Sequence, residues 1–476
     1  MLVVEVAAVV KAYDVRGLVP EQLDAGTARA LGSAFAQVVV RPEGHAGIVL
    51  GRDMRATSPE LADAFAGGVL EQGVDVTDIG LCSTDGLYHA SGTRDLPGAM
   101  VTASHNPAGY NGIKLCRAAA APVGRDSGLA EIRDLAQWLL DRGDLHQLTA
   151  PASAGRRQEV DLLADYAAHL HSLVDLGGIR PLHVVVDAGN GMAGHTVPAV
   201  LGAEGSPLRL DPLHFELDGS FPHHDANPLD PANQRELQEA VRARGADLGL
   251  AFDGDADRVF VVDERGRQVP SGAVTALLAR RLVAREVAAG RDPGDVTVVH
   301  GSILPRAVEE GVAASGARLV TCRVGHTFVK AAMAAQAAVF GAEHSGHYYF
   351  RDFWSADSGL LAVLHLLAAV SEQQRPVSAI LGELDPYAAS GEISLRVPDP
   401  AAAAERVRRW ALDRGARVDD TDGLLVRQDE GSGAFWWVSL RSSNTEPVMR
   451  LTVEARDGAR MEQVRDAVLA VVEQED

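Results

Sequence analysis

Short apolar segments rich in β-branched residues alternate along this chain with longer segments rich in alanine, leucine, glutamate and arginine. The apolar segments include GIVLG (47–51), HVVVDAGNG (183–191), LGLAFDGD (248–255), VTVVHG (296–301) and LVTCRVG (319–325). Strands that alternate with helices predict βαβ units whose mostly parallel sheets are buried on both faces. Connections of this kind are right-handed, and functional loops then gather at the carboxyl ends of the strands. The predicted fold class is therefore α/β.

The chain has 476 residues, enough for three or four domains at roughly 150 residues per domain. The Pro/Ala/Gly/Ser-rich segment LTAPASAGRRQEV (148–160) is a candidate linker, and the polar turn DERGRQ (263–268) marks the opening of a third unit. After residue 387 the order of strand, helix, two strands and helix predicts a smaller α+β domain with an antiparallel sheet. We predict four domains, at residues 1–150, 151–258, 259–375 and 376–476.

Composition excludes several classes of protein. The formal net charge is -21, from 65 acidic and 44 basic side chains, which argues against a nucleic-acid-binding surface but not against a small anionic substrate. Three distant cysteines make no disulfide framework and no zinc site. No segment approaches the roughly 18 apolar residues of a membrane span. The opening MLVVEVAAVVKAYD (1–14) is predicted to be a first strand rather than a signal peptide, so we expect a cytoplasmic protein.

The strongest chemical signal is AFDGDADR (251–258), where a short apolar strand leads into Asp253, Asp255 and Asp257, followed by Arg258. Three carboxylates this close repel one another, and a divalent cation relieves the repulsion, with Mg²⁺ preferring such oxygen ligands. The alternatives are a solvated acidic turn or a calcium loop. An EF-hand counted from Asp253 would place its last ligand at Glu264, but the strand VFVVD occupies the middle of that loop.

A Mg²⁺ ion held by three aspartates keeps positions for water or phosphate oxygens, so a phosphate carrier is expected nearby. MVTASHNP (100–107) has the form of a strand followed by a loop, with Asn106-Pro107 as a turn signal and Ser104 at the strand's carboxyl end. Taken alone, Ser104 is better explained as a turn residue. The Gly-x-Ser-x-Gly elbow of acyl-transfer enzymes is missing.

Two further loops are dense in polar groups. VFGAEHSGHYYF (339–350) presents Glu343, His344, Ser345 and His347, a set suited to sugar hydroxyls and to proton transfer. SLRSSNTEPVMRL (439–451) places a donor-rich segment between two strands, which favours phosphate binding. Its donors are Arg441, Ser442, Ser443, Asn444 and Thr445.

Four segments give weaker signals. KAYDVRG (11–17) places Tyr13 and Arg16 after the predicted first strand and, alone, indicates a surface turn. GHTFVK (325–330) indicates a helix start. DAGNGMAG (187–194) lacks the spacing of a dinucleotide-binding loop and eases a strand-to-helix turn instead. The histidines of HFELDGSFPHHDANP (214–228) could bind metal, although a loop is the preferred interpretation.

Together, TASHNP, DGDADR, GEHSGH-like AEHSGH and RSSNTEP, in this order over nearly the whole chain, resemble the α-D-phosphohexomutase superfamily, and most of all its bacterial phosphomannomutases and phosphomannomutase/phosphoglucomutases. The resemblance implies four domains around a central cleft, the first three alike and the fourth smaller. It also implies a phosphorylated Ser104 that passes its phosphoryl group to a hexose phosphate through a hexose 1,6-bisphosphate. Mg²⁺ would lie between this phosphoserine and Asp253, Asp255 and Asp257.

By the same resemblance Arg258 lies beside the metal, and Glu343 and Ser345 grip sugar hydroxyls. The distal phosphate would be held by Arg441, Ser443, Asn444 and Thr445. Tyr13 and His326 match cleft residues, and Arg16, Lys114 and His347 are candidates for charge stabilisation or proton transfer. The expected function is interconversion of mannose 1-phosphate and mannose 6-phosphate, and of glucose phosphates as well.

The sequence departs from its relatives at His300, where many carry a lysine, and at Ala256, where glycine is frequent. The segment RSSNTEP argues against membership of the phosphoglucosamine mutase subfamily. The alternatives are a phosphoglucomutase and a Mg²⁺-dependent sugar-phosphate phosphatase. A non-catalytic sugar-phosphate-binding relative would more readily have lost Ser104 or an aspartate. The sequence leaves mannose-over-glucose preference, oligomeric state, domain motion and the phosphorylation level of Ser104 open.

Overall fold

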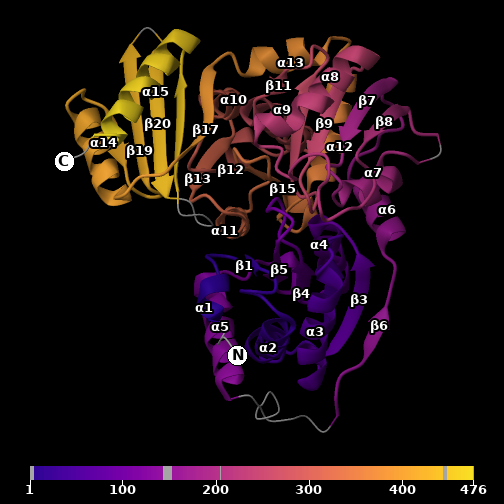
Figure 1. The fold of residues 1–476 in the computed structure, drawn as a ribbon. Coiled ribbons are helices and arrows are strands. Elements are labelled where there is room, and N and C mark those ends of the chain that lie inside the picture. Colours follow the sequence, from indigo (N-terminus) through magenta and orange to yellow (C-terminus); the bar gives the residue numbers. More distant parts are fainter. Residues whose placement is uncertain (1–4, 143–152, 204, 432, 443–447, 475–476) are drawn as a thin grey trace.

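The computed structural model describes residues 5–142, 153–203, 205–431, 433–442 and 448–474. The chain folds into four units, each built on its own sheet (Figure 1). In this view the indigo-to-purple first unit lies below the magenta and orange second and third units, and the yellow fourth unit lies beside the third. Three α/β units and a smaller fourth unit confirm the predicted fold class.

The first sheet has the strand order β1-β5-β4-β2-β3-β6, with β2 parallel to β3 and β4, and β5 antiparallel to β4 and β1. Its strands are β1 (Val15–Leu18), β2 (Gly47–Arg52), β3 (Asp75–Leu81), β4 (Gly98–Val101), β5 (Tyr110–Cys116) and β6 (Arg157–Glu159). The helices of this unit are α1 (Val6–Val9), α2 (Ala25–Phe35), α3 (Ser58–Glu71), α4 (Thr84–Arg94) and α5 (Leu129–Arg142).

Both faces of this sheet are apolar, which explains its unbroken hydrophobic strands. Ile48 and Leu50 of β2 pack into the core beneath α2, α3 and α5, whereas Val49 between them faces Leu87 of α4 on the other side. Side chains alternate between the faces of a strand, so a strand covered on both faces is apolar at every position.

The second sheet has the order β11-β10-β9-β7-β8 and the third β13-β12-β14-β15-β16, each with parallel and antiparallel pairs. Their strands are β7 (Leu182–Asp187), β8 (Leu208–Leu213), β9 (Leu248–Phe252), β10 (Val259–Asp263), β11 (Gln268–Val269), β12 (Thr297–Gly301), β13 (Arg318–Cys322), β14 (Phe340–Ala342), β15 (Tyr348–Phe350) and β16 (Ala356–Asp357). The helices are α6 (Leu163–Leu173), α7 (Ala193–Val200), α8 (Arg235–Arg244), α9 (Ser271–Ala288), α10 (Arg306–Ala314), α11 (His326–Gln336), α12 (Gly359–Ser371) and α13 (Val377–Leu384).

The fourth sheet, β17-β21-β20-β19-β18, is antiparallel throughout, as expected for an α+β unit. Its elements are β17 (Ala388–Leu395), α14 (Pro400–Leu412), β18 (Arg417–Asp419), β19 (Leu424–Gly431), β20 (Ala434–Ser442), β21 (Met449–Ala455) and α15 (Gly458–Val472). The two helices cover one face of the sheet and enclose a core of their own.

Two details differ from the expectations. The predicted strand at 1–14 is wrong over its described part: α1 is a short helix that buries Val6 and Val9, and the first strand, β1, begins only at Val15. Tyr13 therefore precedes β1, and Arg16 lies within it. The predicted boundary after residue 258 falls between β9 and β10, which pair antiparallel in the second sheet.

Candidate active site

Loops from all four units line one cleft, which contains eleven of the residues singled out in the sequence. Those eleven are Tyr13, Arg16, Ser104, Lys114, Arg258, His326, Glu343, His344, Ser345, His347 and Arg441. In each of the first three units the loop follows a strand that pairs in parallel with one neighbour, and it leads into a strand that pairs antiparallel with the first. The two strands are β4 and β5, β9 and β10, and β14 and β15. Equivalent positions in three sheets therefore present the serine, the aspartates and the Glu343–His347 segment.

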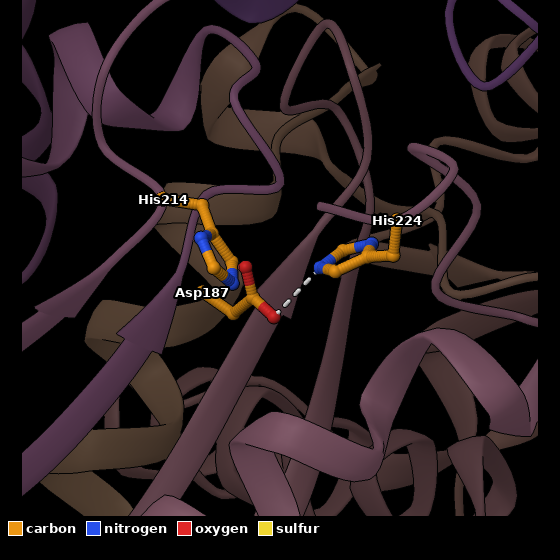
Figure 2. Close-up of side chains that lie close together, drawn as sticks. All are labelled: Asp187, His214 and His224. Atoms are coloured by element: carbon orange, nitrogen blue, oxygen red, sulfur yellow. Dashed lines mark hydrogen bonds and ion pairs between the residues drawn. The ribbon is translucent and has the colours of Figure 1, made fainter. Parts of the chain in front are cut away.

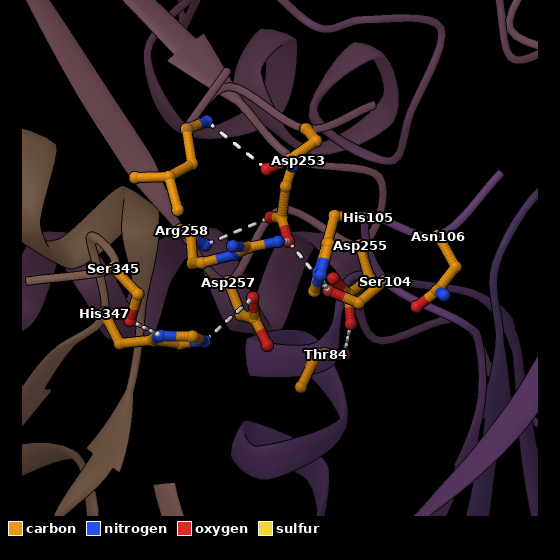
Figure 3. A network of polar contacts seen from close by, with 12 residues as sticks. Thr84, Ser104, His105, Asn106, Asp253, Asp255, Asp257, Arg258, Ser345 and His347 are labelled. Carbon is orange, nitrogen blue, oxygen red and sulfur yellow. Dashed lines mark hydrogen bonds and ion pairs between the residues drawn. The ribbon is translucent and has the colours of Figure 1, made fainter. Parts of the chain in front are cut away.

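Ser104 and Asp253 join the first two of these loops (Figure 3). The Ser104 hydroxyl donates to Asp253 Oδ2 at 2.8 Å, and Ser104 is buried. Gly254 allows this approach, because a Cβ there would lie 2.4 Å from the Ser104 carbonyl oxygen. Ser104 itself has a φ of 50°, in the left-handed region that costs a non-glycine residue energy and that clusters at functional sites.

Arg55, which was not predicted from the sequence, holds the serine loop through its backbone. Its guanidinium donates to the carbonyl oxygens of Ser104 (2.9 Å), Asn106 (2.6 Å), Pro107 (2.8 Å) and Tyr110 (2.9 Å). The buried Asp53 carboxylate lies 3.2 Å from Arg55 Nε and balances its charge. Five N–H donors in a rigid fork suit such a cluster of carbonyls. The only sequence signal was an arginine shortly after strand β2.

The three aspartates are fully buried and their ligand oxygens lie within 4.8 Å of one another. Lys114 Nζ donates to Asp255 and to Asp257, both at 2.6 Å, and Thr84 Oγ1 of the α4 start donates to Asp255 at 2.6 Å. Thr84 was not foreseen, because it comes close only through the packing of α4 against the acidic loop.

Opposing effects act on these carboxyls. Burial raises the pKa of Asp253 to about 8, although Arg258 opposes the shift. Burial also acts to raise the pKa of Asp255, but the Lys114 ammonium outweighs it and the pKa falls. Asp255 Oδ1 and Asp257 Oδ1 are buried with no hydrogen-bond partner. Because buried carboxylate oxygens without partners are costly, this site suits a cation.

Two arginines donate hydrogen bonds to residues that contact or neighbour the serine. Arg258 Nε donates to Asp253 Oδ2 at 2.8 Å. Arg16 Nη1 donates to the Asn106 side chain at 2.6 Å, and Arg16 Nη2 donates to Asp14 at 2.5 Å. Both guanidiniums line the cleft beside Ser104. They place positive charge where an anionic group on the serine would lie.

The loop between β14 and β15 presents its polar groups to the same cleft. Glu343 accepts hydrogen bonds from the Gly325 N–H at 2.7 Å and from the Tyr349 hydroxyl at 2.5 Å. His347 Nδ1 lies 2.9 Å from Ser345 Oγ, and His347 Nε2 lies 3.7 Å from Asp257 Oδ1. Burial, helped by Arg258 and Lys114, holds the pKa of His347 well below its usual value, so its imidazole is neutral near pH 7.

His326 begins α11 and stacks edge-on against Tyr13, with ring centroids 4.8 Å apart.

His300, where many relatives carry a lysine, lies in the interior of the third unit. His300 is fully buried in β12, its Nδ1 lies 2.8 Å from the Gly301 carbonyl oxygen, and burial lowers its pKa to about 4. His300 is therefore uncharged at neutral pH and does not replace a lysine's charge.

The fourth unit closes the cleft with Arg441, Arg450 and Glu392. Glu392 lies 3.6 Å from Arg441 and 3.5 Å from Arg450, and His344 Nε2 is 3.3 Å from the same carboxylate. Glu392 and Arg450 were not predicted. The strands that flank the predicted donor loop are β20 and β21, as expected, but Ser443, Asn444 and Thr445 lie outside the described residues.

Four family models match consecutive parts of the chain, and together they span most of it. They describe the α/β/α domains I, II and III and the C-terminal domain of phosphoglucomutase/phosphomannomutase, at residues 7–138, 164–266, 271–387 and 392–471. The chain belongs to the phosphoglucomutase/phosphomannomutase family. Members of this family are mutase enzymes. The contact between Ser104 and the buried acidic loop therefore lies in a member of a phosphoryl-transfer family.

Known members of the family extend this likeness. A phosphomannomutase from Salmonella typhimurium is 37% identical over 464 residues, covering 96% of this chain and 97% of its own. A protein from Xanthomonas campestris named among the phosphohexose mutases is 39% identical over 457 residues, 96% of each chain. The crystal structure of a phosphoglucomutase/phosphomannomutase family protein from Burkholderia thailandensis is 31% identical, with a TM-score of 0.84 over 98% of this chain and 97% of that one.

No helix in the described ranges is both long and apolar enough to cross a membrane.

Proposed function

We propose that this protein interconverts mannose 1-phosphate and mannose 6-phosphate and that it also accepts glucose phosphates. The observation that carries the proposal is the 2.8 Å hydrogen bond between the Ser104 hydroxyl and Asp253 inside a cleft lined by all four units, because this contact suits a serine nucleophile beside a cation. The relatives named phosphomannomutase, at up to 38% identity over 94% or more of this chain, support mannose phosphates as substrates.

The resident metal in this proposal is Mg²⁺, held by Asp253, Asp255, Asp257 and an oxygen on Ser104. Oxygen-only donors suit this hard cation, and the two carboxylate oxygens without partners fit such a role. When bound, it neutralises charge on the transferring phosphoryl group. Lys114, which bridges Asp255 and Asp257, lies where it would continue to balance their charge.

In the proposed reaction the bond between Ser104 Oγ and phosphorus breaks as a sugar hydroxyl oxygen bonds to phosphorus, giving a hexose 1,6-bisphosphate. The hydroxyl proton passes to a base, and a proton returns to Ser104 Oγ. His347 is suited to accept the proton of the sugar hydroxyl because its imidazole is neutral near pH 7. Arg16, Arg258 and Lys114 would stabilise the developing charge. After the bisphosphate reorients, the reverse transfer rephosphorylates Ser104.

In this proposal the sugar and the distal phosphate of the substrate bind at different ends of the cleft. Glu343 and Ser345 would receive the sugar hydroxyls, since both line the cleft and Glu343 is held in place by Gly325 and Tyr349. Arg441, together with the predicted Ser443, Asn444 and Thr445, would hold the distal phosphate. Tyr13 and His326 would complete the wall between the two ends.

The decisive experiment removes the phosphoryl carrier. Ser104→Ala should lose all measurable interconversion of the mannose phosphates while its circular dichroism stays that of the wild type. Radiolabelled glucose 1,6-bisphosphate should transfer label to the wild type and not to this variant. Ser172→Ala, an exposed helical serine, is the matched control and should behave as the wild type. Full activity of Ser104→Ala would refute the role given to this serine.

Substrate choice is tested by comparing kcat/KM on mannose 1-phosphate, glucose 1-phosphate and glucosamine 1-phosphate, with bisphosphate activator and Mg²⁺. We expect mannose and glucose phosphates to be turned over and glucosamine 1-phosphate to be poor. Steady release of inorganic phosphate with little isomerised sugar would instead identify a phosphatase.

A further inference from the structure

A second group of metal-type ligands lies in the second unit (Figure 2) and shares no residue with the acidic loop. Asp187 is the last residue of β7, His214 directly follows β8, and His224 lies in the loop that leads away from β8. One carboxylate oxygen and one nitrogen from each imidazole lie within 4.8 Å of one another. The proposed reaction uses none of these three side chains.

The spacing of these ligand atoms suits a small cation. Asp187 Oδ2 and His224 Nε2 are 3.0 Å apart. Zinc bonds of about 2.0–2.2 Å in a tetrahedral arrangement place neighbouring ligand atoms about 3.3–3.5 Å apart, which is close to the Asp187–His224 separation and within the 4.8 Å that holds for all three ligand atoms. Asp187 is 1% exposed, and the side chains of His214 and His224 are 8% and 16% exposed, so all three are held by packing.

The surrounding contacts orient the ligands. His224 Nδ1 lies 2.9 Å from the Asp225 carbonyl oxygen, which leaves Nε2 directed at Asp187. Metal-binding histidines commonly donate their second ring N–H to a backbone carbonyl in this way. Asp187 Oδ1 accepts from the Gly189 N–H at 2.9 Å. Glu236 Oε2, 3.1 Å from His214 Nε2, adds a second carboxylate beside the cluster.

Two imidazoles and a carboxylate indicate the class of metal. Nitrogen donors favour Zn²⁺, Co²⁺ or Ni²⁺ over Mg²⁺, which selects oxygen. We propose that Asp187, His214 and His224 form a second cation site that takes a divalent transition metal of the Zn²⁺ type. The acidic loop, whose three aspartates offer oxygen donors, is a separate group of ligands.

Such an ion would fix a loop that reaches the serine. The loop between His214 and His224 contains Gly219, where a Cβ would lie 2.5 Å from Arg55 Cα, and Phe221, whose ring centre lies 5.0 Å from the Arg55 guanidinium. Arg55 in turn donates to the Ser104 carbonyl oxygen. The second site is thus structural, and it tethers the loop that packs behind Arg55.

The test is a calorimetric titration of the full chain with Zn²⁺ in excess Mg²⁺, which saturates the acidic loop. The wild type should bind one Zn²⁺ per chain, and His224→Gln should bind it roughly tenfold or more weakly. His183→Gln is the matched control: His183 lies 2.8 Å from Asp211 in the same unit, outside the cluster, and this variant should bind as the wild type does. Equal affinity of wild type and His224→Gln, or affinity lost equally in both variants, overturns the proposal.

A second measurement on the wild type does not depend on how a variant folds. Co²⁺ added in excess Mg²⁺ should give the visible absorption bands of a cobalt ion with nitrogen ligands and low coordination number, and Zn²⁺ should abolish them. A spectrum no different from that of hydrated Co²⁺ overturns the proposal. Circular dichroism confirms that His224→Gln and His183→Gln are folded before their affinities are compared.

Discussion

At the scale of single residues, the site is a set of buried charges that stabilise one another. Lys114 faces both Asp255 and Asp257, and these two carboxylates retain oxygens without hydrogen-bond partners. Burying charges costs free energy that only close, well-placed partners recover. Removing any one of these charges therefore leaves its partners buried without a compensating charge, which lowers the free energy of unfolding.

Lys114→Met should destabilise the chain most when no metal is present. Breaking a buried ion pair from one side costs about 3–5 kcal/mol, because an uncompensated charge stays behind. Urea unfolding in EDTA should show a loss of that order, and excess Mg²⁺ should restore part of it. Lys11→Met, at an exposed lysine, should change the unfolding free energy by less than about 0.5 kcal/mol. Equal losses with EDTA and with Mg²⁺ would contradict the charge-balance argument.

Glu392 sets a pH dependence in the fourth unit. Burial raises the pKa of this carboxyl, but the hydrogen bond from His344 and the charges of Arg441 and Arg450 outweigh it and lower the pKa to about 2. A depressed carboxyl pKa contributes stability above the unfolded value of 4.5, and this contribution is lost as the pH falls toward 2.

Acid unfolding measured by tryptophan fluorescence should therefore be less steep between pH 4.5 and 2 in Glu392→Gln than in the wild type. Its unfolding free energy at pH 7 should be lower, since the two arginines lose a charged partner. Glu405→Gln, on the exposed side of α14, is the control and should keep the wild-type slope. Identical slopes in wild type and Glu392→Gln would contradict the assignment.

At the scale of elements, hairpin loops at matching places of three sheets present their polar side chains to one cleft. Each loop follows a buried strand whose position is fixed by packing on both faces, so the loops meet with little freedom. The serine loop gains further rigidity from Arg55, which holds four of its carbonyl oxygens. In the proposed function, Arg55 would act through these backbone contacts as a positioning residue.

Arg55→Lys should lower kcat by about 100-fold with little change in KM, because a small misplacement of the reacting group is enough to slow the transfer. A lysine cannot reproduce the fork that contacts four carbonyls. Labelling of Ser104 by the bisphosphate should slow in parallel. Arg52→Lys, at the end of β2, is the control and should retain wild-type kinetics. A rise in KM without a fall in kcat would contradict the positioning role.

At the scale of the whole molecule, hydrophobic cores show which parts depend on one another. One large core joins the second and third units and includes Tyr88 and Cys116 of the first. The fourth unit encloses a separate core within residues 403–472. A small apolar contact of Ile303 and Val324 with Phe435 and Trp437 attaches it to the third unit.

A chain cut after residue 387 should therefore keep the fold of the first three units and lose interconversion activity, because Glu392, Arg441 and Arg450 leave the cleft. Far-UV circular dichroism should account for the three remaining sheets, and Ser104 should still take label from the bisphosphate, although more slowly. Complete unfolding of the truncated chain, or unchanged kcat/KM, would contradict the separation of the cores.

The sequence by itself determined the α/β class, the strands before the site loops, and the order of the four motifs that identify the family. Buried strands read directly as apolar segments, and residue type predicts a metal or phosphate ligand. Cleft membership of Tyr13, Arg16, Lys114 and His326 came only from the family resemblance. The roles of the individual site residues and the cytoplasmic location stay predictions.

Only the tertiary structure decided which distant residues meet. Thr84 and Glu392 have ordinary local sequences and enter the site because separate units pack together, whereas Arg55 reaches the serine loop through packing within the first unit. The opening segment was misjudged for the same kind of reason: burial of Val6 and Val9 against α5 favours a helical turn over a strand. Asp187, His214 and His224 come from two strand ends and a loop, and only the parallel pairing of β7 with β8 brings them within reach of one ion.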